Sequence, residues 1–557
     1  MTFRLFLLTL LAAMMLIGCG GSDDSEGAAA NTMSASDGGN PLFERIDADT
    51  VMIGANLQRV PEDLVDQLWQ PLESMGEYNE MTYKQIAEDA EERSPVIAAL
   101  MREVATIDSR ESVEALGISS NGYWAMHMVS IYPVLHLELS DRDAFVAMLD
   151  RVQSESDAPA PTRMVGDQEI LWMADQGFGV ALHHDERFLT VAMVPDNEGI
   201  LRRVANVEGP TQAFEASNLA DFNGDRGYVG NGSGYMDIRA FFNQLVDTAD
   251  PLSQPAREIL EMGNFLNDTV CRAELDVVFD YFPKMVFGLT TLDTSQMDME
   301  VVVETNADLA GQLAAIADTP VGLSGGETET MSMGVALDLV AARNFARDLV
   351  GSWVATPPQC ALFADIAANA ADWQRALNTP IPPVVTNIRG FRVNIDNFAI
   401  DENGQPADLA GNVALFVRNP QMLLGMAQMF SPEVAEMGVE PNGEPKQLPA
   451  GLIPNMPDMG AYVALSDEAI GMSVGEGQQA NLPAALVSNE ADGAIMAYNI
   501  NFEGYSRLMS TMIERINAVQ GMDESMPPPD FMADFAEYYD TGSFAIRMTD
   551  RGIVFES

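Results

Sequence analysis

The chain has 557 residues, of which 47% are hydrophobic, too many for one ordinary core, so we expect two domains. Asp and Glu number 83 against 29 Lys and Arg, which gives a formal net charge of −54. A field of this sign repels phosphate groups, so the composition excludes a nucleic-acid-binding protein. The acidity is typical of a surface that stays hydrated in salt; attraction of a cationic partner or of divalent ions is the alternative.

The first residues predict an export signal over 1–18. Arg4 is followed by an apolar run, Leu5 to Ile17, that is shorter than the about 20 residues of a membrane-spanning helix. The run ends in Leu-Ile-Gly-Cys19, which resembles the lipobox of bacterial lipoproteins. This resemblance implies cleavage before Cys19 and lipidation of Cys19. The alternative is an ordinary secretory signal with a chance cysteine.

Residues 19–40 predict a flexible acidic tether, since Met33 is their one large apolar side chain. Among lipoproteins of enteric bacteria, Asp after the lipidated cysteine is associated with retention in the inner membrane. Gly20 occupies this position here. The resemblance therefore implies an outer-membrane protein, held by its lipid anchor, with its body in the periplasm.

Recurring segments indicate an internal duplication. Five pairs of similar segments occur in the same order, beginning at Val51 and Met333, Val134 and Asn412, Gly177 and Gly460, Gly234 and Ala497, and Phe287 and Phe544. We expect an α+β fold with two similar halves, 41–320 and 331–557, joined by a glycine-rich linker, 321–330. Each half is predicted to be a largely antiparallel sheet with helices packed on one face.

The strand patterns support a sheet covered on one face. In the segment 189–193 the apolar Leu189, Val191 and Met193 alternate with Thr190 and Ala192, which predicts that the latter two point outward. The fourth pair of segments aligns Tyr235 with Tyr498. We therefore expect these two tyrosines at equivalent positions of the two sheets.

Three short motifs have a chemical and a plain interpretation. Residues 322–326, GLSGG, match a nucleophile elbow, but a loop precedes the serine, so we interpret them as linker. Residues 475–480, GEGQQA, match a loose dinucleotide fingerprint, yet the counterpart VPDNEG would repel phosphate. Residues 221–225, DFNGD, begin like a calcium loop but lack its glycine and closing Glu, so we expect a turn. No cofactor is expected.

The histidines do not predict a metal site. His183 and His184 are adjacent in a predicted strand and should point to opposite faces. His127 and His136 lie on neighbouring strands and can approach each other across a hairpin. The 35 methionines predict either core filling or an adaptable binding surface.

Two cysteines remain after lipidation, Cys271 in NDTVCRAEL and Cys360 in TPPQCALF. These phrases, the lipobox and the paired halves resemble uncharacterised lipoproteins of gammaproteobacteria, a resemblance that implies no known activity. Because exported compartments oxidise thiols, an even pair predicts a disulfide between Cys271 and Cys360. Two separately buried thiols are the alternative.

The sequence thus predicts a non-enzymatic binding or envelope-interaction module, with an envelope protein as partner and an unknown ligand. A carrier that encloses an apolar ligand between its sheet and Met-rich helices is the alternative. A hydrolase is third, because no nucleophile, base and orienting group can be assembled from neighbouring residues.

Overall fold

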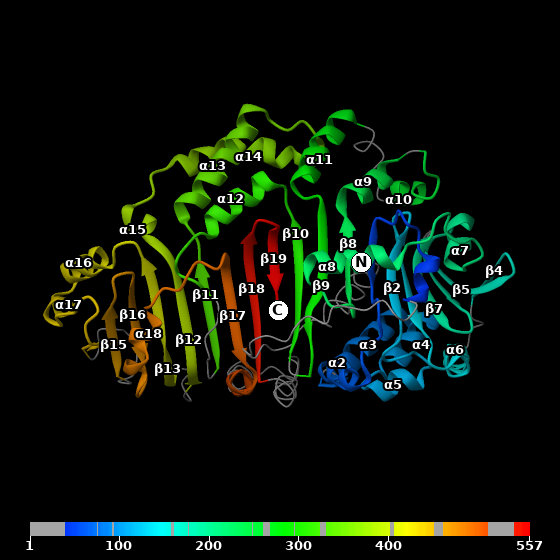
Figure 1. Ribbon diagram of the computed structural model, residues 1–557, viewed down its shortest axis with the longest axis horizontal. Coiled ribbons are helices and arrows are strands. Elements are labelled where there is room, and N and C mark those ends of the chain that lie inside the picture. Colours follow the sequence, from blue (N-terminus) through cyan, green and yellow to red (C-terminus); the bar gives the residue numbers. More distant parts are fainter. Residues whose placement is uncertain are drawn as a thin grey trace. The chain divides into compact units, whose positions relative to one another are not determined.

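The computed structural model describes residues 39–557, except 75, 92–93, 157–160, 176–177, 248, 260–267, 295, 324–329, 401–405, 450–459 and 511–539. The predicted signal peptide, Cys19 and nearly all of the tether lie outside these residues. The chain divides into two compact units, the first ending at Val301 and the second beginning at Val302. Figure 1 labels the elements of both units.

The first unit contains a sheet whose strand order is β4-β5-β6-β7-β3-β2-β1-β8-β9, with every pairing antiparallel. Its strands are β1 (Met52–Ala55), β2 (Trp124–Val129), β3 (Tyr132–Glu138), β4 (Thr162–Val165), β5 (Gln168–Asp175), β6 (Phe178–His184), β7 (Phe188–Pro195), β8 (Ser233–Asp237) and β9 (Lys284–Leu292). Its helices are η2 (Pro41–Arg45), α2 (Glu62–Ser74), α3 (Gly76–Glu91), α4 (Pro95–Val104), α5 (Arg110–Ala115), α6 (Arg142–Glu155), α7 (Glu198–Val204), α8 (Ala216–Arg226), α9 (Ile238–Val246), α10 (Gln254–Ile259) and α11 (Thr269–Tyr281).

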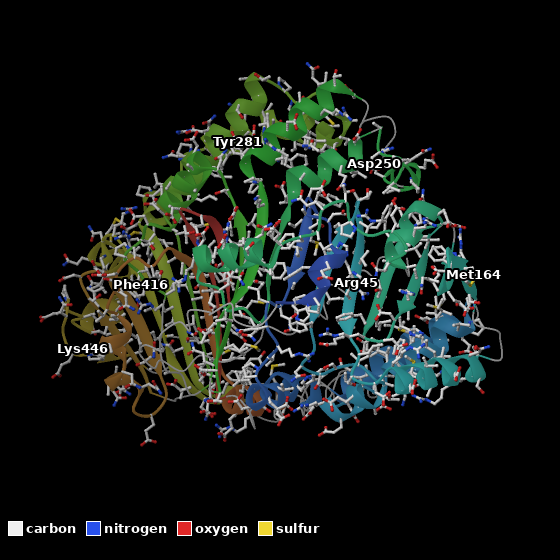
Figure 2. The ribbon with its side chains drawn as sticks, turned by 45° about the vertical axis from the view of Figure 1, so that its right-hand side comes forward. Arg45, Met164, Asp250, Tyr281, Phe416 and Lys446 are labelled. Carbon is white, nitrogen blue, oxygen red and sulfur yellow. The ribbon has the colours of Figure 1, made fainter. Side chains whose placement is uncertain are left out.

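The second unit contains a sheet of order β14-β15-β16-β13-β12-β11-β17-β18-β19, again antiparallel throughout. Its strands are β11 (Met331–Ala336), β12 (Ile388–Ile400), β13 (Pro406–Val417), β14 (Lys446–Gln447), β15 (Ala461–Leu465), β16 (Ala469–Val474), β17 (Ala494–Asn501), β18 (Thr541–Thr549) and β19 (Gly552–Glu556). Its helices are α12 (Ala307–Ala317), α13 (Leu339–Ala355), η3 (Ala361–Phe363), α14 (Ala364–Asn378), α15 (Pro383–Thr386), α16 (Pro420–Phe430), α17 (Pro432–Glu436), η4 (Gln478–Ala480) and α18 (Leu482–Ala485). Figure 2 shows Phe416 among these strands and Lys446 at β14.

The α+β class with antiparallel sheets is confirmed. The order of the strands is also shared: β1, β2, β3, β6, β7, β8 and β9 take the places in the first sheet that β11, β12, β13, β15, β16, β17 and β18 take in the second. The five segment pairs found in the sequence all fall on strands related in this way. A duplication requires this shared order, and the duplication itself stays a prediction.

The boundary between the units differs from the expected one. It falls within β10 (Met297–Glu304), upstream of the predicted linker 321–330. The helix α12, expected in the first half, packs on β18 and β19 of the second unit. Val321 and Leu323 are buried in the core of that unit, where Leu323 covers β11 at Gly334. These linker residues are therefore part of a core.

Helices cover both faces of the first sheet, whereas we expected one covered face. On one face α4 and α6 enclose a core that includes Phe145, Leu182 and Leu189. On the other, α7, α9 and α10 enclose a core that includes Val134 and Ala192. Ala192, predicted to point outward, is therefore buried beneath this second helical layer. Thr190, also predicted to point outward, has an exposed fraction of 0%.

Gly117 allows the backbone before β2 to lie close to the first turn of α6. Gly117 has φ +79°, and a Cβ there would lie 2.6 Å from the backbone N of Phe145 in the first turn of α6. Gly117→Ala should lower the free energy of unfolding by about 2 to 4 kcal/mol, because it adds left-handed strain to a backbone clash. Urea unfolding measures the change. Gly224→Ala is the control, since its Cβ in α8 meets nothing within 4 Å and should be neutral or stabilising. A Gly117→Ala variant as stable as the parent would contradict this close approach.

Candidate functional site

A row of polar side chains crosses the second sheet, with one member on each of six adjacent strands. We call it the polar row; in order across the sheet it consists of Tyr462, Ser473, Asn412, Asn394, Ser332 and Asn499. Directly paired residues of neighbouring strands project from the same face. The row lies on the face that also carries Ala414 and Leu482 of α18, which we call the α18 face. In Figure 1, α18 lies in front of β13 and β16.

Two hydrogen bonds link neighbours within the polar row. Asn394 Nδ2 donates to Asn412 Oδ1 over 3.1 Å, and Asn499 Nδ2 donates to Ser332 Oγ over 3.2 Å. Each carboxamide has two N–H donors and an oxygen with two lone pairs, so each bond leaves further donors and acceptors. Asn394, Ser332 and Asn499 are half-buried, so they present this remaining capacity at the surface.

One end of the polar row is closed over. Asn412 has an exposed fraction of 7% and Ser473 of 0%, and the Ser473 hydroxyl has no hydrogen-bond partner among the described residues. Beside them Gln478 Nε2 donates to Asp396 Oδ2 over 2.7 Å. The bond holds the carboxylate against η4. The row therefore runs from a half-open side at β17 to a closed side at η4.

The positive charge nearest the row in sequence is turned toward the core. Arg392 lies two residues before Asn394 on the same face; its guanidinium lies 4.6 Å from the centre of the Phe416 ring and donates to the carbonyl of Val321. Burial lowers the pKa of Arg392. The row is thus built from neutral groups only.

The first unit has a buried row at the equivalent place. Val134 and Asn412 lie at the same distance in sequence before the N-caps of α6 and α16, Asp141 and Asn419. From Val134 the antiparallel pairing leads to the row Ala181, Ala192, Val134, His127, Ile53 and Tyr235. Except for His127, these residues belong to the hydrophobic clusters beneath α7 and η2 or pack against them. The second unit therefore places amides and hydroxyls where the first has a core.

This equivalence corrects one detail of the sequence alignment. The row pairs Tyr235 with Asn499, whereas the alignment paired it with Tyr498. A shift of one residue moves a strand side chain to the opposite face. Tyr498 accordingly lies on the face opposite the polar row, where it pairs with Met333.

Two histidines form a buried pair in the first unit, an approach that the sequence allowed but did not favour. The Nε2 atoms of His127 and His136 are 3.1 Å apart, and the outer Nδ1 atoms lie 3.3 Å from the Met128 carbonyl and 2.9 Å from Thr190 Oγ1. Because a carbonyl only accepts, we assign the His127 proton to Nδ1. His127 Nε2 then accepts from His136 Nε2–H, and His136 Nδ1 accepts from the Thr190 hydroxyl. The neutral pair is fully hydrogen-bonded.

The surroundings of this pair keep it neutral. Burial lowers the pKa of His127 to about 4 and that of His136 well below its usual value; the charge of Arg45 lowers the latter further. Arg45 itself is paired with Asp185 over 2.5 Å. A neutral, enclosed pair with satisfied partners is a core feature.

Acid should destabilise the first unit through His127. In the unfolded chain its pKa is about 6.5, so below this pH the unfolded chain binds a proton that the folded chain does not. The free energy of unfolding should therefore fall by about 3 kcal/mol between about pH 6.5 and pH 4. Urea unfolding of the parent and of His127→Asn at both ends of this range measures the contribution of His127 to the pH dependence of stability. Asn369→Ala, on exposed helix α14, is the control and should keep the pH dependence of the parent. Equal pH dependence in the parent and His127→Asn would refute the assignment.

His183 and His184 point to opposite faces, as expected. His183 pairs with Thr190, on the side of the histidine pair, whereas His184 packs edge-on against Phe145 of α6, with ring centres 5.6 Å apart. Burial lowers the pKa of both. In the described part of the chain, no group of three or more His, Cys, Asp or Glu side chains is arranged to hold a metal ion.

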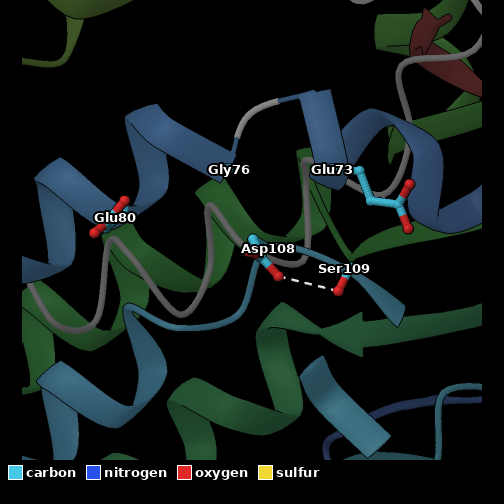
Figure 3. A pocket seen from close by; sticks show the side chains of 5 residues that line it. All are labelled: Glu73, Gly76, Glu80, Asp108 and Ser109. Carbon is cyan, nitrogen blue, oxygen red and sulfur yellow. Dashed lines mark hydrogen bonds between the residues drawn. The ribbon is translucent and has the colours of Figure 1, made fainter. Parts of the chain in front are cut away.

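An acidic hollow lies between α2, α3 and α5 (Figure 3). It has a volume of about 360 Å³ and is lined by Glu73, Gly76, Glu80, Asp108 and Ser109. Ser109 Oγ donates to Asp108 Oδ1 over 3.0 Å and also caps α5. Glu73 accepts from the backbone N of Arg110. These bonds fix helix ends, and nothing in the hollow is directed at a ligand.

The predicted site residues have different outcomes. Cys19 lies outside the described residues. Cys271 in α11 and Cys360 at the start of η3 are both disulfide-bonded and have exposed fractions of 1%. Free, separately buried thiols are therefore excluded. The bond of one to the other, which would link the two units, stays a prediction.

The three short motifs have no site geometry in the described residues. Residues 221–225 lie inside α8, so the expected turn is wrong; the helix continues until Gly227, whose left-handed backbone ends it. Residues 475–480 form the turn that follows β16 and the short helix η4. Of 322–326, Gly322 and Leu323 are buried, and the remainder lies outside the described residues.

Comparisons with known proteins add little. No family model and no curated protein matches the chain. Two solved structures, crystal forms I and III of TP0453, are similar at 12% and 10% identity. Both matches cover 52% of this chain. The match covers 89% of the form I chain with a TM-score of 0.22, and 91% of the form III chain with a TM-score of 0.23. Likeness at this level carries no functional argument.

Proposed function

We propose that the protein is an outer-membrane lipoprotein, anchored through Cys19, whose body acts in the periplasm as a non-enzymatic binding module of the envelope. The lipobox supports the anchor. No helix in the described residues is long and apolar enough to cross a membrane. The polar row supports the binding function, and it is the observation that carries the proposal.

The polar row differs from its counterpart in the kind of surface it makes. In the first unit the equivalent residues are covered by helices and fill a core, which serves folding alone. In the second unit they are half-buried or buried neutral polar groups that are bonded only in part. Convergent polar groups with spare hydrogen-bonding capacity are typical of ligand sites.

A cross-linking experiment in cells tests the binding function. The protein and the variant Asn394→Ala/Asn499→Ala are cross-linked, recovered and compared by mass spectrometry. We expect the variant to lose a molecule that the parent captures, because the half-buried amides contact it. Asn369→Ala, on exposed helix α14, is the control and should behave as the parent. Identical captures by all three proteins would contradict the proposal.

A second candidate function is favoured by the opposite face of the same sheet. There Phe391 pairs with Leu415, and Val393 with Val413, whose exposed fraction is 40%. A carrier would hold an apolar ligand against such side chains. Native mass spectrometry of the delipidated protein should then show a co-purified hydrophobic molecule, and its absence would remove this candidate.

A further inference from the structure

Resting on the proposed binding function, we infer that the polar row is a site for a neutral oligosaccharide, which lies across strands β13, β12, β11 and β17 of the second unit. The inference rests on the chemistry of the side chains, their spacing, and an unpartnered buried hydroxyl at the closed end.

The chemistry of the row matches sugar hydroxyl and acetamido groups. Such groups both donate and accept hydrogen bonds, as do Asn carboxamides and Ser hydroxyls. In a chain with 83 acidic residues, the row contains no charged side chain. The surrounding field disfavours anionic ligands. A neutral ligand rich in hydroxyls therefore fits the row better than a phosphate or a carboxylate.

The spacing of the row suits a repeating ligand. Adjacent strands lie about 4.8 Å apart, so the row offers one polar group at each such step. This step is close to the length of one sugar ring in an extended chain. Asn394, Ser332 and Asn499 present three successive half-buried groups. An oligosaccharide can thus contact several strands at once.

The closed end supplies two further features. The Ser473 hydroxyl is fully buried and has no partner, which costs stability. The first unit has Ala192 at this place and avoids that cost. A ligand that extends past β13 would reach Tyr462 on β15, whose half-buried ring ends the row and whose aromatic face can pack against sugar C–H groups.

The test is calorimetric titration of the full-length protein in a polyoxyethylene detergent, which has no sugar headgroup. The probes are the β-1,4-linked tetrasaccharide of N-acetylglucosamine, the neutral tetrasaccharide of glucose and anionic tetragalacturonate. We expect at least one neutral probe to bind and the anionic probe to bind more weakly. Asn394→Ala/Asn499→Ala should weaken neutral binding by about ten-fold, through the loss of neutral hydrogen bonds.

A second variant guards against loss of folding. Asn412→Val/Ser473→Ala installs the residues that the first unit has at these places, so the fold should tolerate it. It should weaken neutral binding through Asn394, which loses the acceptor that Asn412 Oδ1 gives it, without lowering the melting temperature. Asn369→Ala should bind as the parent.

The outcomes separate the ligand class from the binding function. Absence of neutral binding, or equal binding by the parent and both row variants, overturns the oligosaccharide site. If the row variants still lose a protein captured in cells, the binding module survives and its ligand is a protein. If the row variants bind the probes as the parent does and capture the same molecules in cells, the proposed function fails as well.

Discussion

The Cys271→Ala/Cys360→Ala variant should lose about 4 to 5 kcal/mol of unfolding free energy relative to the oxidised parent. Cross-linking two residues this far apart removes loop-closure entropy from the unfolded chain, and the gain rises slowly with loop length. Both cysteines are disulfide-bonded and buried, and lipidation of Cys19 would leave them only each other as partners. The bond would join α11 of the first unit to the turn before η3 of the second.

Denaturant unfolding of the parent, the parent with reductant and the variant measures this effect. Reduction should lower the stability of the parent nearly to that of the variant and leave the variant unchanged. Peptide mapping without reduction should yield one peptide pair containing Cys271 and Cys360. Two alkylated free thiols in the unreduced protein, or equal stabilities throughout, would contradict the link.

Replacement of Cys19 by Ser should release the protein from the membrane fraction. The thioether that carries two acyl chains cannot form on a hydroxyl, and each buried methylene contributes about 0.8 kcal/mol to membrane binding. We therefore expect an unprocessed or soluble form in place of a membrane-bound one. Fractionation and intact mass measure both changes.

Gly20→Asp is the companion variant for localisation. By resemblance to lipoproteins of enteric bacteria, it should move the protein from the outer to the inner membrane and leave lipidation intact. Normal processing and unchanged fractionation of Cys19→Ser would show that the lipobox resemblance is accidental.

The sequence predicted the positions of strands along the chain better than their surroundings. Alternating patterns and five recurring segments located strands that share one order in both units. The second helical layer was missed, because α7, α9 and α10 bury Ala192 through contacts distant in sequence. Alternation of apolar and polar residues in a strand predicts that the two faces of the sheet differ. It does not predict that the face with the smaller residues is exposed, since small residues can be buried there as well.

The polar row was missed although part of its signal is local. In β12 the polar Arg392, Asn394 and Asp396 alternate with apolar side chains, which has the period of a strand. The row itself depends on the register of five pairings, and bulges in β12 shift that register. The one-residue misalignment of Tyr235 with Tyr498 shows how easily register is lost without a structure.

For the histidine pair, the sequence indicated which residues are neighbours but not their environment. Adjacent strands and a short turn placed His127 and His136 within reach, and the structure brings their Nε2 atoms to 3.1 Å. What the sequence did not show is the enclosure by η2 and its Arg45, which comes from far along the chain and helps lower the pKa of His136. Local pattern predicted proximity, and tertiary packing determined the chemistry.

The central claim is that the α18 face of the second unit is the binding surface, and site-specific photo-cross-linking in cells tests it most directly. A photo-reactive phenylalanine analogue replaces Asn394 on the polar row or, in a separate strain, Val413 on the opposite face. Both sites lie on adjacent strands and have accessible side chains. The account predicts a discrete adduct from position 394 and none from position 413. An adduct from position 413 alone, or none from position 394, would contradict it.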